Sequence, residues 1–368
     1  MVLVTAETFI RMNPDSAILT IAIPTYNRAA RLQAQIERLL PQLGPEVRLC
    51  VYDNASPDGT REVVSKYLSR GVCYYRAANN GGAGRNIFRC FEECQTEWLW
   101  ILSDDDPIAS GAVADLLQLV RHCHADFIHT SSPLCRHDSE VIVGDVSQLL
   151  KQASLASLLW ISTVVYRIPS FRSLFWLYVE SISTWGPQLV VLLAVLERQG
   201  GKGLASSTRL IIEPPGEPRW STLDFIARFS RVPEYLQASR HQALVARRIW
   251  EYYYWALLGG LLELDNPAAI RRWQRIRKSA RQNFRAFGAR SPIWDVILKK
   301  WYRAGSRKSS LTVVHQALTV TILAWCPSSL FFPVLKLLPK PAWVCEVLRR
   351  GRNETSADID ETCQSSRA

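Results

Sequence analysis

The amino-acid sequence predicts an α/β protein, with a mainly parallel, twisted sheet flanked by helices and a mostly helical region after it. Over the first hundred residues, short apolar runs of strand character alternate with segments whose apolar residues recur at helical spacing. A polar cluster follows each apolar run, and from about residue 220 the pattern turns helical. Strands that alternate with helices favour parallel pairing, because each helix returns the chain to the same end of the sheet.

The elements are expected in a regular order. They are strand 18–23, helix 29–40 with Leu32, Ile36, Leu39 and Leu40 on one face, strand 47–52, a helix with Val63, Val64, Tyr67 and Leu68 on one face, strand 72–75, helix 87–94 and strand 98–102. Farther along, residues 158–166 predict one or two more strands. In such a sheet the polar clusters lie at the carboxyl ends of the strands, where ligands bind.

The most informative polar cluster is three consecutive aspartates, Asp104, Asp105 and Asp106, directly after the apolar run 98–102. Adjacent carboxylates repel one another, and the apolar run indicates a partly desolvated site. A divalent cation would relieve the repulsion, and hard oxygen ligands suit Mg²⁺ or Mn²⁺, which can also bridge to substrate phosphates. Considered alone, a solvated acidic turn or a helix N-cap explains the triplet equally well.

The three earlier clusters offer groups that suit a nucleotide. Thr25, Tyr26 and Asn27 could contact a base, and Asp53 could accept a hydrogen bond from an imide or a ribose. A glycine-rich turn at residues 79–86 allows close approach of a pyrophosphate, whose charge Arg85 could pair. Each cluster alone is ordinary turn chemistry, but four in order favour one shared ligand site. The glycine turn has neither GxGxxG nor GxxxxGKS spacing, which argues against dinucleotide-binding and P-loop motifs.

These motifs resemble those of family 2 glycosyltransferases with the GT-A fold. Residues 23–28 (IPTYNR) resemble that family's opening motif, residues 51–60 (VYDNASPDGT) its second, residues 79–86 its third, and residues 102–106 (LSDDD) its DxD metal motif. The resemblance is close over residues 16–125 and looser to about 215. It implies a nucleotide-diphospho-sugar donor, a divalent metal ion, and inverting transfer of one sugar to an acceptor hydroxyl.

Carried over residue by residue, the resemblance implies that Tyr26 stacks near the base, that Asp53 contacts the base and that Arg85 faces the diphosphate. The nucleotide-sugar site would comprise Pro24, Thr25, Tyr26, Asn27, Arg28, Asp53, Asn54, Gly82, Arg85, Asn86, Asp104 and Asp105, and the metal ligands would come from Asp104, Asp105 and Asp106. The register of the DxD motif stays open. Many relatives have an Asp where Ser103 stands, which would make Asp105 the second metal-side carboxylate.

The sequence departs from the family's pattern on the acceptor side. Relatives usually carry an acidic pair late in the domain, whose Asp acts as general base on the attacking hydroxyl. The corresponding residues 186–189 (GPQL) contain no carboxylate, and Gln188 cannot act as a base. Glu180 and Glu197 are the nearest acids and therefore the candidates, although each could be an ordinary surface residue. O-antigen and capsule transferases similar to abequosyltransferases also lack the pair, so loss of activity need not follow.

The C-terminal region has its own charge and hydropathy. Residues 271–308 carry 13 basic residues against one acid, or +12, whereas the whole chain carries +11. Interleaved aromatic residues favour an anionic membrane surface as partner over a nucleic acid. Residues 311–338 are apolar but interrupted, and fall short of the about 20 residues that a span needs. We expect an interfacial or re-entrant hairpin there, with a buried helix pair as the alternative.

These features divide the chain into an N-terminal extension (1–15), a GT-A glycosyltransferase domain (16–218), a helical, basic, membrane-associating region (219–350) and a disordered tail (351–368). Residues 1–15 do not resemble a signal peptide. Nine scattered cysteines without a CxxC pair predict reduced thiols, and no zinc site is expected around His122, His124 and His129. The expected location is peripheral, on the cytoplasmic face of a bacterial inner membrane.

The sequence therefore predicts a metal-dependent, inverting glycosyltransferase. It would move a hexosyl or deoxyhexosyl group from a nucleotide-diphospho-sugar to a lipid-linked saccharide acceptor in the synthesis of a surface polysaccharide such as O-antigen. One alternative is a nucleotidyltransferase that makes nucleotide-sugars, which would need a glycine-rich, lysine-bearing motif that residues 24–28 do not provide. The other is a non-catalytic, membrane-bound module that keeps the sheet without the base.

Overall fold

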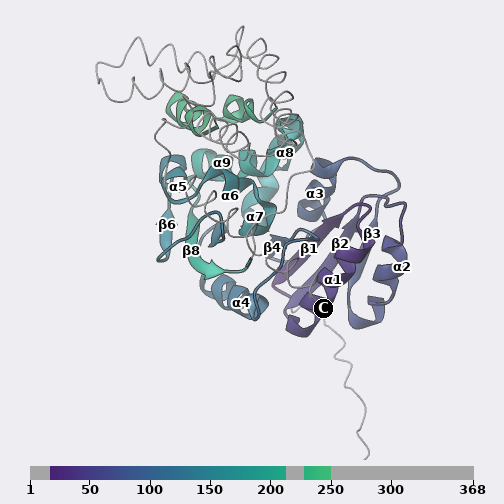
Figure 1. Ribbon diagram of the computed structural model, residues 1–368. Coiled ribbons are helices and arrows are strands. Elements are labelled where there is room, and N and C mark those ends of the chain that lie inside the picture. The colour runs from purple at the N-terminus through teal and green to yellow at the C-terminus, as the bar shows by residue number, and fades with distance from the viewer. Residues whose placement is uncertain (1–16, 213–227, 250–368) are drawn as a thin grey trace, which may run out of the picture. The chain divides into compact units, whose positions relative to one another are not determined.

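The first structural unit is built on an eight-stranded sheet covered by helices (Figure 1). The computed structural model describes residues 17–212 and 228–249. The chain divides into two compact units, residues 1–244 and 245–368, and the sheet belongs to the first. The predicted extension, the 218/219 boundary, the basic block, the apolar segment 311–338 and the tail all lie outside the described residues and stay predictions.

The sheet is mostly parallel, as predicted. Its strands are β1 (Leu19–Thr25), β2 (Val47–Asp53), β3 (Cys73–Arg76), β4 (Trp98–Ile101), β5 (Phe127–Ser131), β6 (Val141–Val143), β7 (Val164–Arg167) and β8 (Gly203–Arg209). They lie in the order β3-β2-β1-β4-β7-β5-β8-β6. Strands β1 to β4 pair in parallel, as do β5 and β8, whereas β7 and β6 run antiparallel to their neighbours. The carboxyl ends of β1 to β4 therefore share one edge.

The α-helices connect these strands and cover the sheet. They are α1 (Ala29–Leu39), α2 (Thr60–Ser65), α3 (Ala83–Glu92), α4 (Ala112–His122), α5 (Val146–Gln152), α6 (Leu155–Leu159), α7 (Ile168–Phe171), α8 (Phe175–Glu180) and α9 (Pro187–Arg198). A further helical segment begins at residue 239.

Three predicted elements differ from the structure. Helix α3 begins at residue 83, four residues earlier than predicted, so the glycine turn leads directly into its first turn. Helix α2 ends at residue 65, and Leu68, placed on its apolar face by the sequence, is exposed. Of residues 158–166, only 164–166 lie in a strand, β7 (Val164–Arg167), because the residues before it form α6 and a short 3₁₀ turn.

The hydrophobic core forms where apolar residues alternate along the strands and recur at helical spacing in α1. Leu19, Ile21 and Ile23 point to one face of β1 and join a buried cluster with Leu32 and Ile36 of α1. Helix α9 is buried around its whole circumference from residue 187 to 196, which is typical of a central helix.

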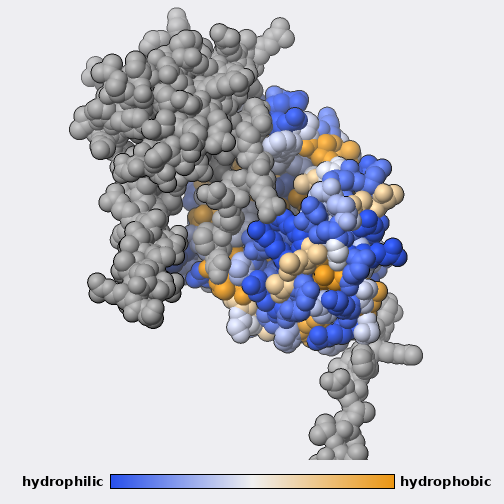
Figure 2. Space-filling view, turned by 45° about the vertical axis from the view of Figure 1, so that its right-hand side comes forward, coloured by the Kyte–Doolittle hydropathy of each residue, from blue (hydrophilic) through white to orange (hydrophobic). Residues whose placement is uncertain are grey.

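Within the described ranges, no helix combines the length and the apolar character needed to cross a membrane. The face seen in Figure 2 is mainly hydrophilic, with hydrophobic residues scattered across it.

Candidate functional site

The four polar clusters meet at the carboxyl edge of β1 to β4. Thr25 Oγ1 donates a hydrogen bond to Asp104 Oδ2 at 2.7 Å, which joins the loop after β1 to the loop after β4. The backbone N–H of Asn54, after β2, donates to the carbonyl oxygen of Thr25 at 3.0 Å. The Asn54 side chain reaches the glycine turn, accepting from Gly81 N at 3.0 Å and donating to Asn80 Oδ1 at 2.8 Å. Segments far apart in sequence therefore form one hydrogen-bonded site.

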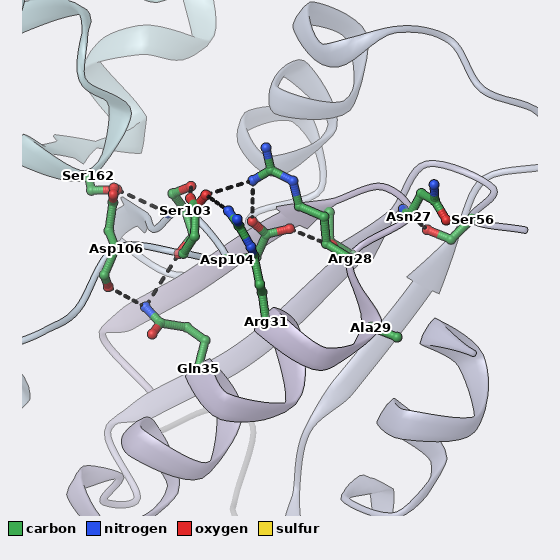
Figure 3. Close-up of polar contacts among 12 residues, drawn as sticks. Asn27, Arg28, Ala29, Arg31, Gln35, Ser56, Ser103, Asp104, Asp106 and Ser162 are labelled. Carbon is green, nitrogen blue, oxygen red and sulfur yellow. Dashed lines mark hydrogen bonds and ion pairs between the residues drawn. The ribbon is translucent and has the colours of Figure 1, made fainter. Parts of the chain in front are cut away.

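Two arginines contact the acidic cluster, Arg28 at the N-cap of α1 and Arg31 in its first turn (Figure 3). Arg28 Nη1 lies 2.7 Å from Asp104 Oδ1 and 3.1 Å from Asp105 Oδ2, and Arg31 Nη1 lies 2.5 Å from the same Asp105 oxygen. Asp104 is 3% exposed and Asp106 is 4% exposed, whereas the Asp105 side chain is 28% exposed. Three carboxylates and two guanidinium groups leave a formal charge of −1. The predicted desolvation is confirmed, but the arginines already relieve much of the repulsion.

Asp106 is not held by the two arginines. Its carboxylate accepts hydrogen bonds from side chains that the sequence did not indicate. Trp160 Nε1 and Ser162 Oγ each donate to Asp106 Oδ2 at 2.5 Å, and Ser162 Oγ accepts from Ser103 N at 3.0 Å. Gln35 Nε2 donates to the Asp106 carbonyl oxygen at 2.8 Å (Figure 3). Helical spacing could have indicated that Arg31 and Gln35 follow Arg28 on one face of α1. No local signal pointed to Trp160 or Ser162.

The surroundings give the three carboxyl groups different acidities. Burial raises the pKa of Asp104 and the pKa of Asp106 above the usual range, against the opposing effect of their hydrogen bonds. Burial also acts on Asp105, but the Ser103 hydroxyl and the charges of Arg28 and Arg31 outweigh it and lower the pKa of Asp105. Asp105 is therefore both the most exposed of the three and the most readily ionised.

The donor set of this cluster fits a hard divalent cation. It consists of carboxylate oxygens with a residual negative charge, which suits Mg²⁺ or Mn²⁺. The Asp105 side chain stays 28% exposed, although Ser103 Oγ donates to its Oδ1 and both arginines pair with its Oδ2. Asp106 Oδ1 accepts no hydrogen bond from any residue in the described part of the chain. Asp105, with Asp106 and Asp104 beside it, is therefore the group that could hold such an ion.

The Asp53 carboxylate is occupied by the protein. It is fully buried, with Oδ1 accepting from Ser56 N at 2.8 Å and Oδ2 accepting from Tyr74 Oη at 2.6 Å and Arg76 Nη1 at 2.5 Å. Burial would raise the pKa of Asp53, but these hydrogen bonds outweigh it and lower that pKa. This carboxylate therefore braces the loop after β2, and its contact with a base stays a prediction.

The glycine turn presents only some of its predicted residues to solvent. Gly82 has φ +86°, a conformation that favours glycine, and lies exposed before α3. Arg85 is exposed and folds over Gly81, where a Cβ would lie 2.6 Å from Arg85 Cδ. Asn86 is buried, and its Nδ2 donates to the Tyr52 carbonyl oxygen at 2.7 Å. Asn86 and Asn54 therefore support the turn, and Gly82 and Arg85 face solvent.

The loop after β1 keeps one aromatic side chain free for a ligand. Tyr26 is 43% exposed, whereas Thr25 is buried and Pro24 is half-buried. Asn27 has φ +55°, and its backbone N–H donates to Ser56 Oγ at 2.9 Å, which holds this strained position. Tyr26 is thus presented at the same edge as the acidic cluster.

The two candidate bases differ sharply. Glu197 Oε2 accepts from Gln237 N at 2.7 Å, and Oε1 accepts from Ala238 N at 2.9 Å and lies 2.8 Å from His241 Nδ1. Burial would raise the pKa of Glu197, but these hydrogen bonds outweigh it and lower the pKa, which makes Glu197 a poor base. The structure therefore argues against Glu197, which supports the helical segment that begins at residue 239.

Glu180 is exposed at the end of α8, and Tyr235 Oη donates to its carbonyl oxygen at 3.2 Å. Tyr178 of the same helix donates through Oη to the carbonyl oxygen of Gly84 at 3.2 Å, so α8 packs beside the start of α3. Gln188, where relatives carry the acidic pair, lies in the first turn of α9 and is 5% exposed. Of the two candidates, Glu180 is therefore the one whose carboxylate has no hydrogen-bond partner among residues 17–212 and 228–249.

Known proteins share this domain. Residues 20–169 match the family model described as Glycosyl transferase family 2. Abequosyltransferase RfbV of Salmonella typhimurium is 29% identical over 114 residues, which cover 30% of this chain and 34% of that protein. A Campylobacter jejuni protein, GalNAc(5)-diNAcBac-PP-undecaprenol beta-1,3-glucosyltransferase, is 27% identical over 110 residues, which cover 29% of this chain and 36% of that one. The chain thus spans about a third of the length of these curated relatives.

Solved structures share the fold. The crystal structure of S. aureus TarS 1–349 in complex with UDP-GlcNAc matches with a TM-score of 0.51 at 15% identity, over 71% of this chain and 80% of that chain. Its complex with UDP matches with a TM-score of 0.52 at 14% identity, over 79% and 92% of the two chains. Residues 20–169 of this chain therefore resemble a family 2 glycosyltransferase domain, and the sheet that they contribute to has the GT-A fold.

Proposed function

We propose that this chain transfers a sugar from a nucleotide-diphospho-sugar to an acceptor hydroxyl with inversion at the anomeric carbon. The observation that carries the proposal is the convergence of Arg28 and Arg31 with Asp104, Asp105 and Asp106 at the carboxyl edge of the parallel strands. The relatives support it, since two of them are named as sugar transferases and S. aureus TarS 1–349 is described in complex with UDP-GlcNAc.

Different exposed residues at this edge of the sheet would contact different parts of the nucleotide-sugar donor. The ring of Tyr26 offers a stacking surface for the base, and Arg85, exposed beside the glycine turn, offers a cation for the diphosphate. Arg28 and Arg31 are fixed by their carboxylate partners, so their positive charge is in place before a substrate arrives. A divalent cation held by Asp105, with Asp104 and Asp106, would supply further charge stabilisation for the departing nucleoside diphosphate.

Inverting transfer needs a general base on the acceptor side, and we assign the role of that base to Glu180. Its carboxylate is exposed, on a helix that packs against the start of α3. In a single displacement, Glu180 would take the proton of the attacking hydroxyl while the bond from the sugar to the diphosphate breaks. The three hydrogen-bond partners of Glu197 support this choice of Glu180 over Glu197.

We also propose a lipid-linked saccharide acceptor, a part in surface-polysaccharide synthesis and a peripheral position on the cytoplasmic face of a membrane. The polyprenyl diphosphate in the name of the Campylobacter relative and the charge of residues 271–308 support these points. Sedimentation of the full chain with vesicles tests the location. We expect salt-sensitive binding to vesicles that contain phosphatidylglycerol and little binding to phosphatidylcholine alone, and equal binding to both would contradict it.

The donor site is tested by thermal unfolding of the full chain with a panel of nucleoside diphosphates, with and without Mn²⁺. We expect one nucleotide to stabilise the protein only when metal is present. Asp105→Asn should lose this shift, whereas Asp115→Asn, on the exposed face of α4, should keep it. No shift with any nucleotide would favour the non-catalytic alternative, and stabilisation by a nucleoside triphosphate with a sugar phosphate would favour the nucleotidyltransferase.

A further inference from the structure

Two histidines and a cysteine form a cluster separate from the acidic site. His129 lies in the middle of β5, and Cys135 and His137 lie on the connection from β5 to β6. One ligand atom from each of the three side chains lies within 4.8 Å of the other two. Along the chain His129 is near His122 and His124, but the fold brings it to Cys135 and His137 instead. No zinc site is expected around these histidines from the sequence, but His129 is 1% exposed and lies beside two other ligand-type side chains.

The two imidazole rings approach each other edge-on, with one ring nitrogen of each at the contact. His129 Nδ1 lies 2.7 Å from His137 Nε2, and His129 Nε2 lies 2.7 Å from Ser157 Oγ. When Nε2–H donates to the serine hydroxyl, Nδ1 is left with a free lone pair directed at His137. A hydrogen-bond partner on the outer nitrogen is the arrangement that orients metal-binding histidines in proteins.

Cys135 supplies a softer ligand atom, its thiol sulfur, from the connection after β5. It sits at the end of a tight turn in which the backbones of Ser132 and Cys135 bond to each other, and its side chain is half-buried. Its Sγ currently donates to the carbonyl oxygen of Gln152 at 3.3 Å. Asp138 and Glu140 act electrostatically on His137 from the same connection, which adds negative charge near the cluster.

We propose that His129 Nδ1, His137 Nε2 and Cys135 Sγ bind a borderline-soft divalent cation of the Zn²⁺ class. Bond lengths of about 2.0–2.1 Å to nitrogen and about 2.3 Å to sulfur place tetrahedral ligand atoms about 3.3–3.6 Å apart. The two nitrogens would separate by about 0.6 Å to reach this spacing, and the sulfur would close on them by rotation of the Cys135 side chain. The thiol releases its proton to solvent as the thiolate bonds to the metal.

The ligand types distinguish this site from the acidic cluster. Two nitrogens and a sulfur select Zn²⁺ or Co²⁺ over Mg²⁺, whereas the all-oxygen set of Asp104, Asp105 and Asp106 suits the harder ions. The chain would therefore hold two cations of different chemistry at separate places, and an excess of Mg²⁺ would not fill the site of His129 and Cys135.

Ser157 connects the proposed site to the acidic cluster. Its hydroxyl contacts His129, and its carbonyl oxygen accepts hydrogen bonds from Trp160 N at 3.1 Å and from Thr163 Oγ1 at 2.7 Å. Trp160 and Ser162 of the same short segment hold Asp106. A cation on His129 would thus fix the far end of the segment that positions the third aspartate.

Cobalt spectroscopy on the full chain tests the proposal. The protein is treated with a chelator, dialysed into excess Mg²⁺ and titrated with Co²⁺, which gives a thiolate-to-cobalt charge-transfer band only when sulfur binds the metal. We expect the band to saturate at one equivalent and to disappear when Zn²⁺ is added. Cys135→Ser and His137→Gln should abolish the band, while the matched controls Cys123→Ser and His122→Gln, both at the end of α4, should keep it.

Thermal unfolding provides a second measurement on the same samples. Zn²⁺ should raise the unfolding temperature of the native chain and of both controls, and should leave Cys135→Ser unchanged. We expect Cys135→Ser to fold, because a serine hydroxyl can still donate to the Gln152 carbonyl oxygen. The absence of the band in the native chain, or a full band in Cys135→Ser, would overturn the proposal.

Discussion

Ser162 tests how the acidic cluster is held in place. The residue is fully buried, and its hydroxyl donates to Asp106 Oδ2 at 2.5 Å and accepts from Ser103 N at 3.0 Å. In Ser162→Ala the protein loses a hydrogen bond to a charged group, about 1.5–3 kcal/mol, and a neutral one, about 1 kcal/mol. Trp160 still donates to the same oxygen, so we expect the free energy of unfolding to fall by about 3 kcal/mol.

Urea unfolding followed by circular dichroism and tryptophan fluorescence measures this change. The matched control is Ser65→Ala, an exposed serine whose hydroxyl donates to the Glu62 carbonyl oxygen at 2.7 Å, and it should change the free energy by less than about 0.5 kcal/mol. The metal-dependent nucleotide shift should also weaken in Ser162→Ala, since Asp106 loses one of the two donors that orient its carboxylate. Equal stability of the two variants would refute the assignment of Ser162 as a support of Asp106.

Three further predictions follow from the same contacts. Asp106→Asn should keep the fold, because its amide oxygen can accept both hydrogen bonds, but sugar transfer should fall by about 100-fold or more, and an active variant in metal-free buffer would contradict the proposed site. Asp53 has a folded-state pKa below its unfolded value of about 3.9, so its stabilisation is present above that pH and is lost as the pH falls through the folded-state pKa. Asp53→Asn should therefore flatten the acid limb of the stability–pH curve, and an unchanged limb would contradict this. Glu180→Gln should lower kcat by about 100-fold with little change in nucleotide binding, whereas Glu197→Gln should mainly lower stability; transfer assays and urea unfolding of the two variants separate these outcomes.

Strands and helices with strong periodicity were predicted close to their observed bounds, and those governed by caps and turns were not. Helix α1 was expected over 29–40 and covers Ala29–Leu39, because its apolar residues recur at helical spacing. Residues 158 and 159, the end of helix α6, were predicted as strand, but Ser154 caps this helix by accepting a hydrogen bond from Ser157 N at 3.1 Å. A cap of this kind outweighs the strand propensity of the apolar residues that follow it.

The insertion of β7 between β4 and β5 had no local signal. Two antiparallel pairings, with β4 on one side and β5 on the other, place it there, and both join segments distant in sequence. The same applies to the cluster of His129, Cys135 and His137, whose members become neighbours only when the connection after β5 folds back over the strand.

Local sequence was sufficient to predict the order of the first seven elements and the position of a polar cluster after each of the first four strands, because burial imposes a period on the residues of each element. Packing between distant segments decided which polar groups of those clusters face a ligand. Asp53 and Asn86 turn toward the protein, and Asp106 is held by Trp160 and Ser162, 54 and 56 residues away in sequence. Buried polar atoms must find hydrogen-bond partners, and the partner of each is determined by which segments the fold brings together.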